Sequence, residues 1–432
     1  MNKFLSLLFF LLTLSCFSQS NKLVITDDIS NFWTAYDLII QEKDSTKQID
    51  LINNLYIKKG TPGLVGIMQA RRYTDKGYIY AINNYPKFWN SIRANTLTAN
   101  SYAKKLEKGI KKLKKIYPEA KPAKIYFSIG VLKTSGTTKE DKVLIGAEVA
   151  MADSTIITGE IKKDYPHLIS YFKTNPINNL DFLNVHEYIH TQQKSTIGNY
   201  LLSQAMMEGV AEFVAEIAMK TKSPNPQIEF GYKNEEKIKQ EFTKEMFSTN
   251  FNNWFWNSPE NQFGMRDLGY FVGYAIVKKY YDNSIDKKLA TKELIELDYN
   301  NEADLVKLVN KASYFEKPVN DYKIDFENNR PIVTKIEQFD NGNLAVNPTI
   351  KIVTLYFSHP MDINSRGFEY GPLGESNLMR VKKVIGYSAD KKSFSFEVSL
   401  EPNKQYQLLV TNFFDDKGFA LKPYLIDFKT SK

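Results

Sequence analysis

Two histidines and a glutamate lie close together in the segment His186-Glu187-Tyr188-Ile189-His190. On a helix, residues four positions apart share one face, so His186 and His190 can present two imidazoles to one metal ion. Glu187 lies one step round the helix, where its carboxylate can accept a proton from water that the metal activates. The chain has four histidines, and this motif uses two of them. This scarcity favours a metal site over a chance match.

The motif needs a third ligand, and Glu208 lies on the next long predicted helix, over residues 201–220. If the two helices run antiparallel through a turn at Gly198, Glu208 folds back towards His186 and His190. Two histidines and one glutamate leave one position of a tetrahedral zinc site for water, as a catalytic zinc requires. Other divalent ions can also use this ligand set. Glu212 is four residues beyond Glu208, and either orients one histidine through its distal N–H or is a plain surface charge.

Hydrolysis at such a site also requires a group that stabilises the oxyanion of the tetrahedral intermediate. Neither remaining histidine is well placed for this role, because His167 precedes the motif and His359 lies in a β-rich region. Tyr270 follows the third ligand on a predicted helix, with Tyr274 on the same face. We predict Tyr270 for this role, with Tyr274 as its neighbour. The alternative for both is aromatic packing, since the chain contains 26 tyrosines.

The pattern of apolar residues predicts the elements that carry these side chains. The expected helices cover 27–57, 65–72, a segment from Pro86, 101–117, 180–194, 201–220, 235–246, 268–281, 287–297 and 303–314. Strands are predicted at 124–132 and 143–149, with a third at 154–158, and a polar loop is predicted at 135–141. A small sheet therefore precedes the motif helix. An edge strand of such a sheet can pair with an extended peptide.

The chain has 432 residues, which indicates two or three domains, and 43% hydrophobic residues, which indicates a globular protein. Its net charge is +8. Several lysines lie on the predicted helix 101–117, where they fit the solvent face of a packed helix. No nucleic-acid-binding module is present, so we predict no nucleic-acid partner. An acidic envelope surface could still attract the protein.

Residues 1–18 have the features of a secretory signal peptide, with Lys3 before an apolar run from Phe4 to Leu14. The run is too short to span a bilayer. Cys16 is the only cysteine, so either it is removed with the signal or it becomes the lipid-carrying first residue of a lipoprotein. We therefore expect an exported protein that is periplasmic, secreted or associated with the outer membrane, without an internal disulfide.

The chain resembles the gluzincin metallopeptidases in His186-Glu187-x-x-His190 followed by Glu208-Gly209-Val210-Ala211. The resemblance implies that His186, His190 and Glu208 are zinc ligands and that Glu187 is the catalytic base. It also implies that Tyr270 stabilises the transition state, as in the aminopeptidase branch. Here 17 residues separate His190 from Glu208, fewer than in the related branches. The aminopeptidase motif G-x-M-x-N is absent, so that specificity does not carry over.

A closer resemblance, over about Ile29 to Tyr281, is to a bacterial family of predicted zinc-dependent proteases of unknown substrate. It includes Phe32-Trp33-x-x-Tyr36-Asp37, Ile145-Gly146-x-Glu148 and Gly269-Tyr270-x-x-Gly273, besides the metal motifs. From Arg330 the chain alternates as six short predicted strands, which favours a β-sandwich. Asn347-Pro348-Thr349 and the segment Phe357 to Asp362 resemble bacterial Ig-like modules.

These features predict an α+β chain: a signal peptide at 1–18, a mostly helical zincin-like domain with a small sheet at 19–328, and an Ig-like β-sandwich at 329–432. The predicted function is zinc-dependent hydrolysis of a peptide or protein substrate. One alternative is a non-catalytic binding protein of the cell envelope on a zincin scaffold, although a structural site has no need of Glu187. Another is hydrolysis of a non-peptide amide by the same chemistry.

Overall fold

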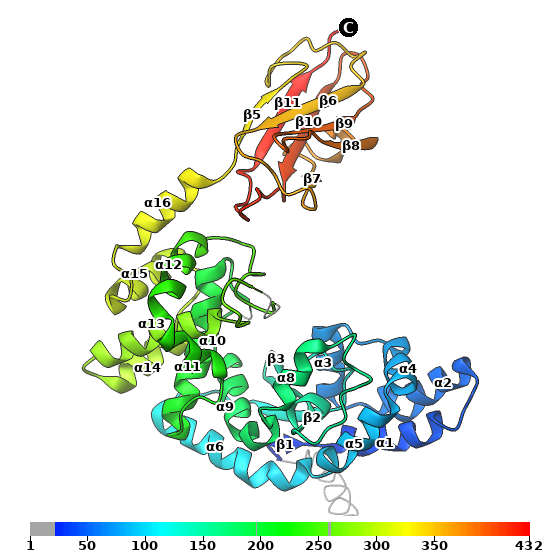
Figure 1. Cartoon of the computed structure of the whole chain (residues 1–432), viewed down its shortest axis with the longest axis vertical. Coiled ribbons are helices and arrows are strands. Elements are labelled where there is room, and N and C mark those ends of the chain that lie inside the picture. Colours follow the sequence, from blue (N-terminus) through cyan, green and yellow to red (C-terminus); the bar gives the residue numbers. More distant parts are fainter. Residues whose placement is uncertain (1–21, 196, 258–260) are drawn as a thin grey trace, which may run out of the picture. The chain divides into compact units, whose positions relative to one another are not determined.

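A computed structural model describes residues 22–195, 197–257 and 261–432, and these residues form an α+β fold (Figure 1). The predicted signal peptide at 1–18, including Cys16, lies outside the described residues. The chain divides into two compact units. Unit 1 takes its described residues from Met1–Thr196, Met207–Pro226 and Tyr281–Asp298, and unit 2 from Ile197–Met206, Gln227–Tyr280 and Tyr299–Lys432. Among the described helices, none has the length and apolar character needed to cross a membrane.

Unit 1 contains a four-stranded sheet in the order β1-β2-β4-β3. Strands β1 (Val24–Ile25), β2 (Lys124–Ser128) and β4 (Lys142–Gly146) are parallel, and β3 (Gly136–Lys139) is antiparallel to β4. The prediction of a polar loop at 135–141 was therefore wrong over β3. Polar residues are common on edge strands, whose outer side faces solvent, so β3 lacks the apolar signal of a central strand. The third strand predicted at 154–158 was also wrong, because that segment forms turns.

Helices surround this sheet in unit 1. They are α1 (Asp27–Ile39), α2 (Ser45–Leu55), α3 (Pro62–Arg71), α4 (Asp75–Asn84), α5 (Pro86–Leu97), α6 (Ala103–Ile116), α7 (Ala147–Ala150), α8 (Pro166–Phe172), α9 (Leu180–His190) and α14 (Lys287–Glu296), with α10 (Leu201–Met219) from Met207 onward. The single helix predicted at 27–57 is two helices, because the Asp44 carboxylate accepts backbone N–H bonds from Thr46 and Lys47 and starts α2. In α6, Leu106, Ile110 and Leu113 are buried, which agrees with the packed helix predicted at 101–117.

The segment between β2 and β3 is held by buried polar side chains. The hydroxyls of Tyr56 and Tyr78 both donate to the carbonyl of Ile129, at 2.7 and 2.9 Å. The Glu148 carboxylate, which is fully buried, accepts the backbone N–H groups of Gly130 and Leu132, at 2.8 and 3.0 Å. These bonds end β2 at Ser128, short of the predicted residue 132, and turn the chain towards β3.

Unit 2 contains helices and a strand-rich C-terminal part. The helices are α11 (Pro226–Lys233), α12 (Glu235–Glu245), most of α13 (Gly269–Asn283), α15 (Glu302–Ala312) and α16 (Val319–Asn329). Two sheets follow, β5-β6-β9-β8 and β11-β10-β7, and their strands pair antiparallel. The strands are β5 (Val333–Ile336), β6 (Ile352–Phe357), β7 (Gly367–Glu369), β8 (Lys383–Tyr387), β9 (Ser393–Glu397), β10 (Gln405–Thr411) and β11 (Tyr424–Lys429).

Both sheets of unit 2 contribute to one apolar core. Val353 and Phe396 come from the first sheet, and Leu408, Ile426 and Phe428 from the second. Along β9 and β10 the buried residues recur with the period of two that a strand with one buried face requires. The switch from helical to strand patterning predicted near residue 329 coincides with the end of α16.

Candidate metal centre

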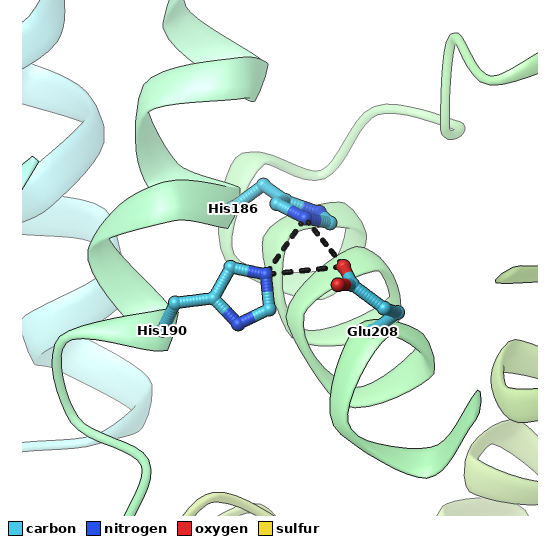
Figure 2. Close-up of side chains that lie close together, drawn as sticks. All are labelled: His186, His190 and Glu208. Atoms are coloured by element: carbon cyan, nitrogen blue, oxygen red, sulfur yellow. Dashed lines mark hydrogen bonds and ion pairs between the residues drawn. The ribbon is translucent and has the colours of Figure 1, made fainter. Parts of the chain in front are cut away.

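The sequence motif lies on α9, and the third predicted ligand lies on α10, within unit 1 (Figure 2). The Nε2 atoms of His186 and His190 are 3.1 Å apart. The Glu208 Oε2 atom is 3.2 Å from His190 Nε2 and 3.5 Å from His186 Nε2. Figure 2 shows these three side chains converging from two helices. Two imidazole nitrogens and one carboxylate oxygen in this arrangement can hold a metal ion.

The three side chains are removed from solvent. His186 and Glu208 are 6% and 8% exposed, and the His190 side chain is 12% exposed. Apolar residues of α9 and α10, including Val185, Ile189 and Val210, are fully buried and hold the two helices in place. Buried ionisable groups are costly unless they are paired or coordinate a metal. The burial of this group therefore agrees with a ligand site and disagrees with a solvated surface cluster.

Glu212 orients the first histidine. Its Oε2 atom lies 2.9 Å from His186 Nδ1, and its Oε1 atom accepts a hydrogen bond from the Ser223 hydroxyl. The bond to Nδ1 places the ring proton there and leaves Nε2 of His186 with a free lone pair for a metal. Glu212 is itself 4% exposed, so it is not the plain surface charge that the sequence allowed as an alternative.

Gln193 plays the same part for the second histidine, and the sequence analysis missed it. Its Oε1 atom lies 2.7 Å from His190 Nδ1, and its amide nitrogen donates to the Met207 carbonyl at 2.9 Å. One buried amide therefore joins the end of α9 to the residue before Glu208. The only sequence signal was its position three residues after His190, just beyond the end of the helix.

The charges of the ligand group shift its pKa values. Burial lowers the pKa of His186, but hydrogen bonds to Glu208 and Glu212 outweigh burial and raise it to about 10. For Glu208, burial raises the pKa, but the charge of His190 and the bonds to both histidines outweigh this, so the pKa falls well below its ordinary value.

Glu187 lies on the same helix but makes a different contact. It is 8% exposed, and burial raises the pKa of its carboxyl group. A Cβ atom placed on Gly136 would lie 2.7 Å from Glu187 Oε1, so the backbone at the start of β3 is in close contact with this carboxylate. Helix α9 packs against β3. The candidate base therefore lies between the two histidines and the edge strand.

The edge strand has backbone groups that are not paired with β4. Gly146 N–H donates to the Ser135 carbonyl, which makes Ser135 and Gly146 a hydrogen-bonded pair. In the antiparallel register Gly136 pairs with Ile145 and Thr138 with Val143. Hydrogen-bonded and non-bonded pairs alternate, so the N–H and C=O groups of Gly136 and Thr138 point away from β4. The Gly136 carbonyl accepts a bond from the Thr134 hydroxyl.

The predicted oxyanion group belongs to another part of the chain. Tyr270 and Tyr274 lie on α13 in unit 2, whereas the metal ligands belong to unit 1. The Tyr270 ring lies 5.4 Å from that of Phe255, and the Tyr274 ring 6.3 Å from that of Tyr232. The role predicted for Tyr270, with Tyr274 as its neighbour, stays a prediction. Within unit 1, burial raises the pKa of Tyr171 on α8, while a hydrogen bond to Ser135 lowers it and the charge of Glu187 raises it. No motif marked Tyr171 in the sequence.

Comparisons with known proteins do not assign this chain to a family. No protein-family model matches it, and no curated protein matches it. Among solved structures, CopC from Methylosinus trichosporium OB3b is 12% identical over 24% of this chain and 94% of that one, with a TM-score of 0.20. The N-terminal part of the bacterial S-layer protein SbsC is 13% identical over 94% and 71% of the two chains, with a TM-score of 0.18. These similarities are too low to support a fold or a function.

Proposed function

We propose that this chain is an exported zinc-dependent peptidase, with a zincin-like helical part and an Ig-like β-sandwich at its C-terminus. The observation that carries the proposal is the spacing of the three donor atoms. Atoms that bind one tetrahedral zinc at about 2.0–2.1 Å lie about 3.3 Å from one another. The donor atoms of His186, His190 and Glu208 are 3.1, 3.2 and 3.5 Å apart. Zinc would supply Lewis acidity that polarises water and the substrate carbonyl.

Glu187 is the proposed general base. Its carboxylate lies against the start of β3, and it is not one of the three groups that would hold the metal. Burial raises the pKa of Glu187, which makes it a stronger proton acceptor than an exposed glutamate. It takes a proton from the attacking water and passes this proton to the nitrogen of the leaving amine. A purely structural metal site would not require a buried carboxylate at this position.

Strand β3 supports a peptide as the substrate. An extended peptide can add to an exposed sheet edge through main-chain hydrogen bonds. The outward N–H and carbonyl of Thr138, which is partly exposed, are such groups, and Gly136, two residues before it, is buried in contact with Glu187. A peptide that pairs with β3 would therefore pass the proposed base. This placement favours hydrolysis of a peptide bond over that of a compact non-peptide amide.

The test is the Glu187→Gln variant of the full chain without residues 1–18. Zinc content per chain is measured by mass spectrometry, and hydrolysis is measured on casein and on a mixed-sequence peptide library. We expect one zinc in the wild type and in the variant, with hydrolysis reduced at least about 100-fold in the variant. Glu401→Gln, which changes an exposed glutamate of unit 2, is the matched control and should hydrolyse normally.

Two results would contradict the proposal. Equal hydrolysis by Glu187→Gln and the wild type would exclude Glu187 as the base. A full zinc content in Glu208→Ala, with unchanged affinity, would exclude Glu208 as a ligand.

A second candidate function is that of a non-catalytic binding protein of the cell envelope. It is favoured by a hollow of about 640 Å³ in the strand-rich part, lined by Phe368, Tyr370, Leu378 and Arg380 among others. Tyr370 is 61% exposed there. A wild-type protein that binds zinc but hydrolyses no peptide in the library would favour this function.

A further inference from the structure

We propose that Arg71 binds a carboxylate group of the substrate, so that the site acts on peptides with an acidic side chain or a free C-terminus near the cleaved bond. This inference rests on the proposed peptidase function and specifies its substrate class. It depends on a guanidinium group at the end of α3, which packs against β3, and on a buried donor of that group that makes no hydrogen bond.

The Arg71 guanidinium has a buried donor without a partner. Its Nε atom is shielded from solvent and makes no hydrogen bond. No ion pair with an acidic side chain is found for Arg71 among the residues that the structure describes. A buried donor without a hydrogen-bond partner in the protein costs free energy, so such a donor calls for a partner from outside the chain. An arginine in this condition is suited to a carboxylate, which can accept two parallel N–H bonds.

The position of Arg71 follows from the segment that leads into β3. Arg71 is the last residue of α3, and α3 packs against β3 and β4. The Lys133 ammonium donates to the Arg71 carbonyl at 3.3 Å. Three residues later, the backbone at Gly136 is in close contact with the Glu187 carboxylate. The short segment 133–136 therefore touches the end of α3 at one end and the proposed base at the other.

Electrostatics agree with this placement. Burial raises the pKa of Glu187, and the charge of Arg71 is among the groups that lower it. The Arg71 charge thus reaches the proposed base without pairing with it. Lys133 is a second cation near this point, with its ammonium 5.6 Å from the centre of the Tyr73 ring. A substrate carboxylate would meet positive charge at this end of β3.

The ligand is therefore defined as a carboxylate, and it has two sources in a peptide. One is the side chain of an aspartate or glutamate, and the other is the terminal carboxylate. A hydrogen-bonded charge pair of this kind contributes more to binding than a neutral hydrogen bond, because both groups are charged. Replacement of the carboxylate by an amide should weaken binding about 10–100-fold.

The experiment measures binding separately from hydrolysis. Zinc-loaded Glu187→Gln protein is titrated into three pools of fluorescent octapeptides, and binding is followed by fluorescence anisotropy. The first pool carries one glutamate, at varied positions, and a C-terminal amide. The second has glutamine in place of glutamate, and the third has glutamine and a free C-terminus. We expect the first or the third pool to bind about 10–100-fold more tightly than the second, and the tighter pool identifies the source of the carboxylate.

Three further variants assign the preference to Arg71. Arg71→Gln, in the same background, should reduce the difference between pools to less than about twofold, and Arg71→Lys should retain part of it. Arg72→Gln is the matched control, because Arg72 carries the same charge at the next position but is exposed. It should keep the preference. Zinc content and circular dichroism confirm that each variant is folded.

The outcomes separate this inference from the proposed function. Three results would overturn the role of Arg71. All pools bind equally, no pool binds, or the preference for a carboxylate survives Arg71→Gln. Wild-type hydrolysis of the neutral pool at an undiminished rate would overturn it as well, while leaving the peptidase function in place. The peptidase function alone would be overturned if two results occur together. The carboxylate preference depends on Arg71, and the wild-type protein hydrolyses none of the pools.

Discussion

Gly136 offers a direct way to disturb the proposed base without touching the metal ligands. The change Gly136→Ala adds one methyl group at the start of β3. Its Cβ atom would lie 2.7 Å from Glu187 Oε1, 3.0 Å from Cγ and 3.1 Å from Cδ. Ordinary contacts of a Cβ atom begin at 3.4 Å, so Oε1 must retreat by 3.4 − 2.7 = 0.7 Å or β3 must move.

The expected result is a loss of rate with the metal retained. A displacement of about 1 Å in a reacting group can reduce a rate about 100-fold, so a shift of 0.7 Å predicts a fall in kcat of roughly 10–100-fold. The end of a glutamate side chain moves easily, so the cost in stability should not exceed about 1–3 kcal/mol. His186, His190 and Glu208 keep their positions, and one zinc per chain should remain.

The assay compares kcat, zinc content and thermal unfolding for Gly136→Ala and the wild type. Gly159→Ala is the matched control, because a Cβ atom on Gly159 meets nothing within 4 Å. This control should show wild-type kcat. A Gly136→Ala protein with full zinc and undiminished kcat would refute the assignment of Glu187 as a base held in place by β3. Loss of zinc would refute the separation of base and ligands.

Two further predictions concern residues that support the site. Gln193→Leu removes the hydrogen bond to His190 Nδ1, so the Kd for zinc should rise about 10–100-fold. Competition with a chelator measures this Kd, and an unchanged value would exclude Gln193 as the residue that orients His190. Burial raises the pKa of Glu148 from 4.5 to about 7. The native state therefore holds an extra proton between these values, and stability should fall by roughly 3 kcal/mol as pH rises from 4.5 to 7. Urea unfolding at several pH values should show that slope in the wild type and little of it in Glu148→Gln.

The sequence was sufficient for the parts of the fold that depend on local patterns. The motif helix predicted at 180–194 is α9 (Leu180–His190), and the helix predicted at 201–220 is α10 (Leu201–Met219). Both helices have apolar residues at helical spacing, and packing against neighbouring elements stabilises the same conformation. The last of the six strands predicted after Arg330 matches β11, where buried Ile426 and Phe428 alternate with partly exposed residues. Short segments such as α8 and β7 were not predicted, because they are too brief to establish a period. Helix α4 was also not predicted, although it has ten residues.

The supporting residues of the site were not predictable in this way. His186 and His190 are four residues apart on one helix, so their geometry is fixed locally. Gln193 contacts His190 from three residues away, but it lies beyond the end of α9, where a helical period no longer predicts contacts. Tyr171 and Arg71 lie on α8 and α3, and no motif marks them in the sequence. Glu212 could be proposed because it lies one helical turn from Glu208. Glu208 comes from a second helix and was predicted because the motif resembles one that joins two helices, whereas no motif marked the other supporting residues.

The edge strand shows why this limit matters for function. Strand β3 has a polar sequence, Gly136-Thr137-Thr138-Lys139, because its outer edge must remain open and soluble. The same property removes the apolar pattern by which a strand is predicted. Its position is fixed instead by Glu148, Tyr56 and Tyr78, which hold the segment before it through buried hydrogen bonds. The strand proposed to bind an extended peptide is thus specified by residues distant in sequence. Its edge is therefore harder to predict from a sequence than the candidate metal ligands.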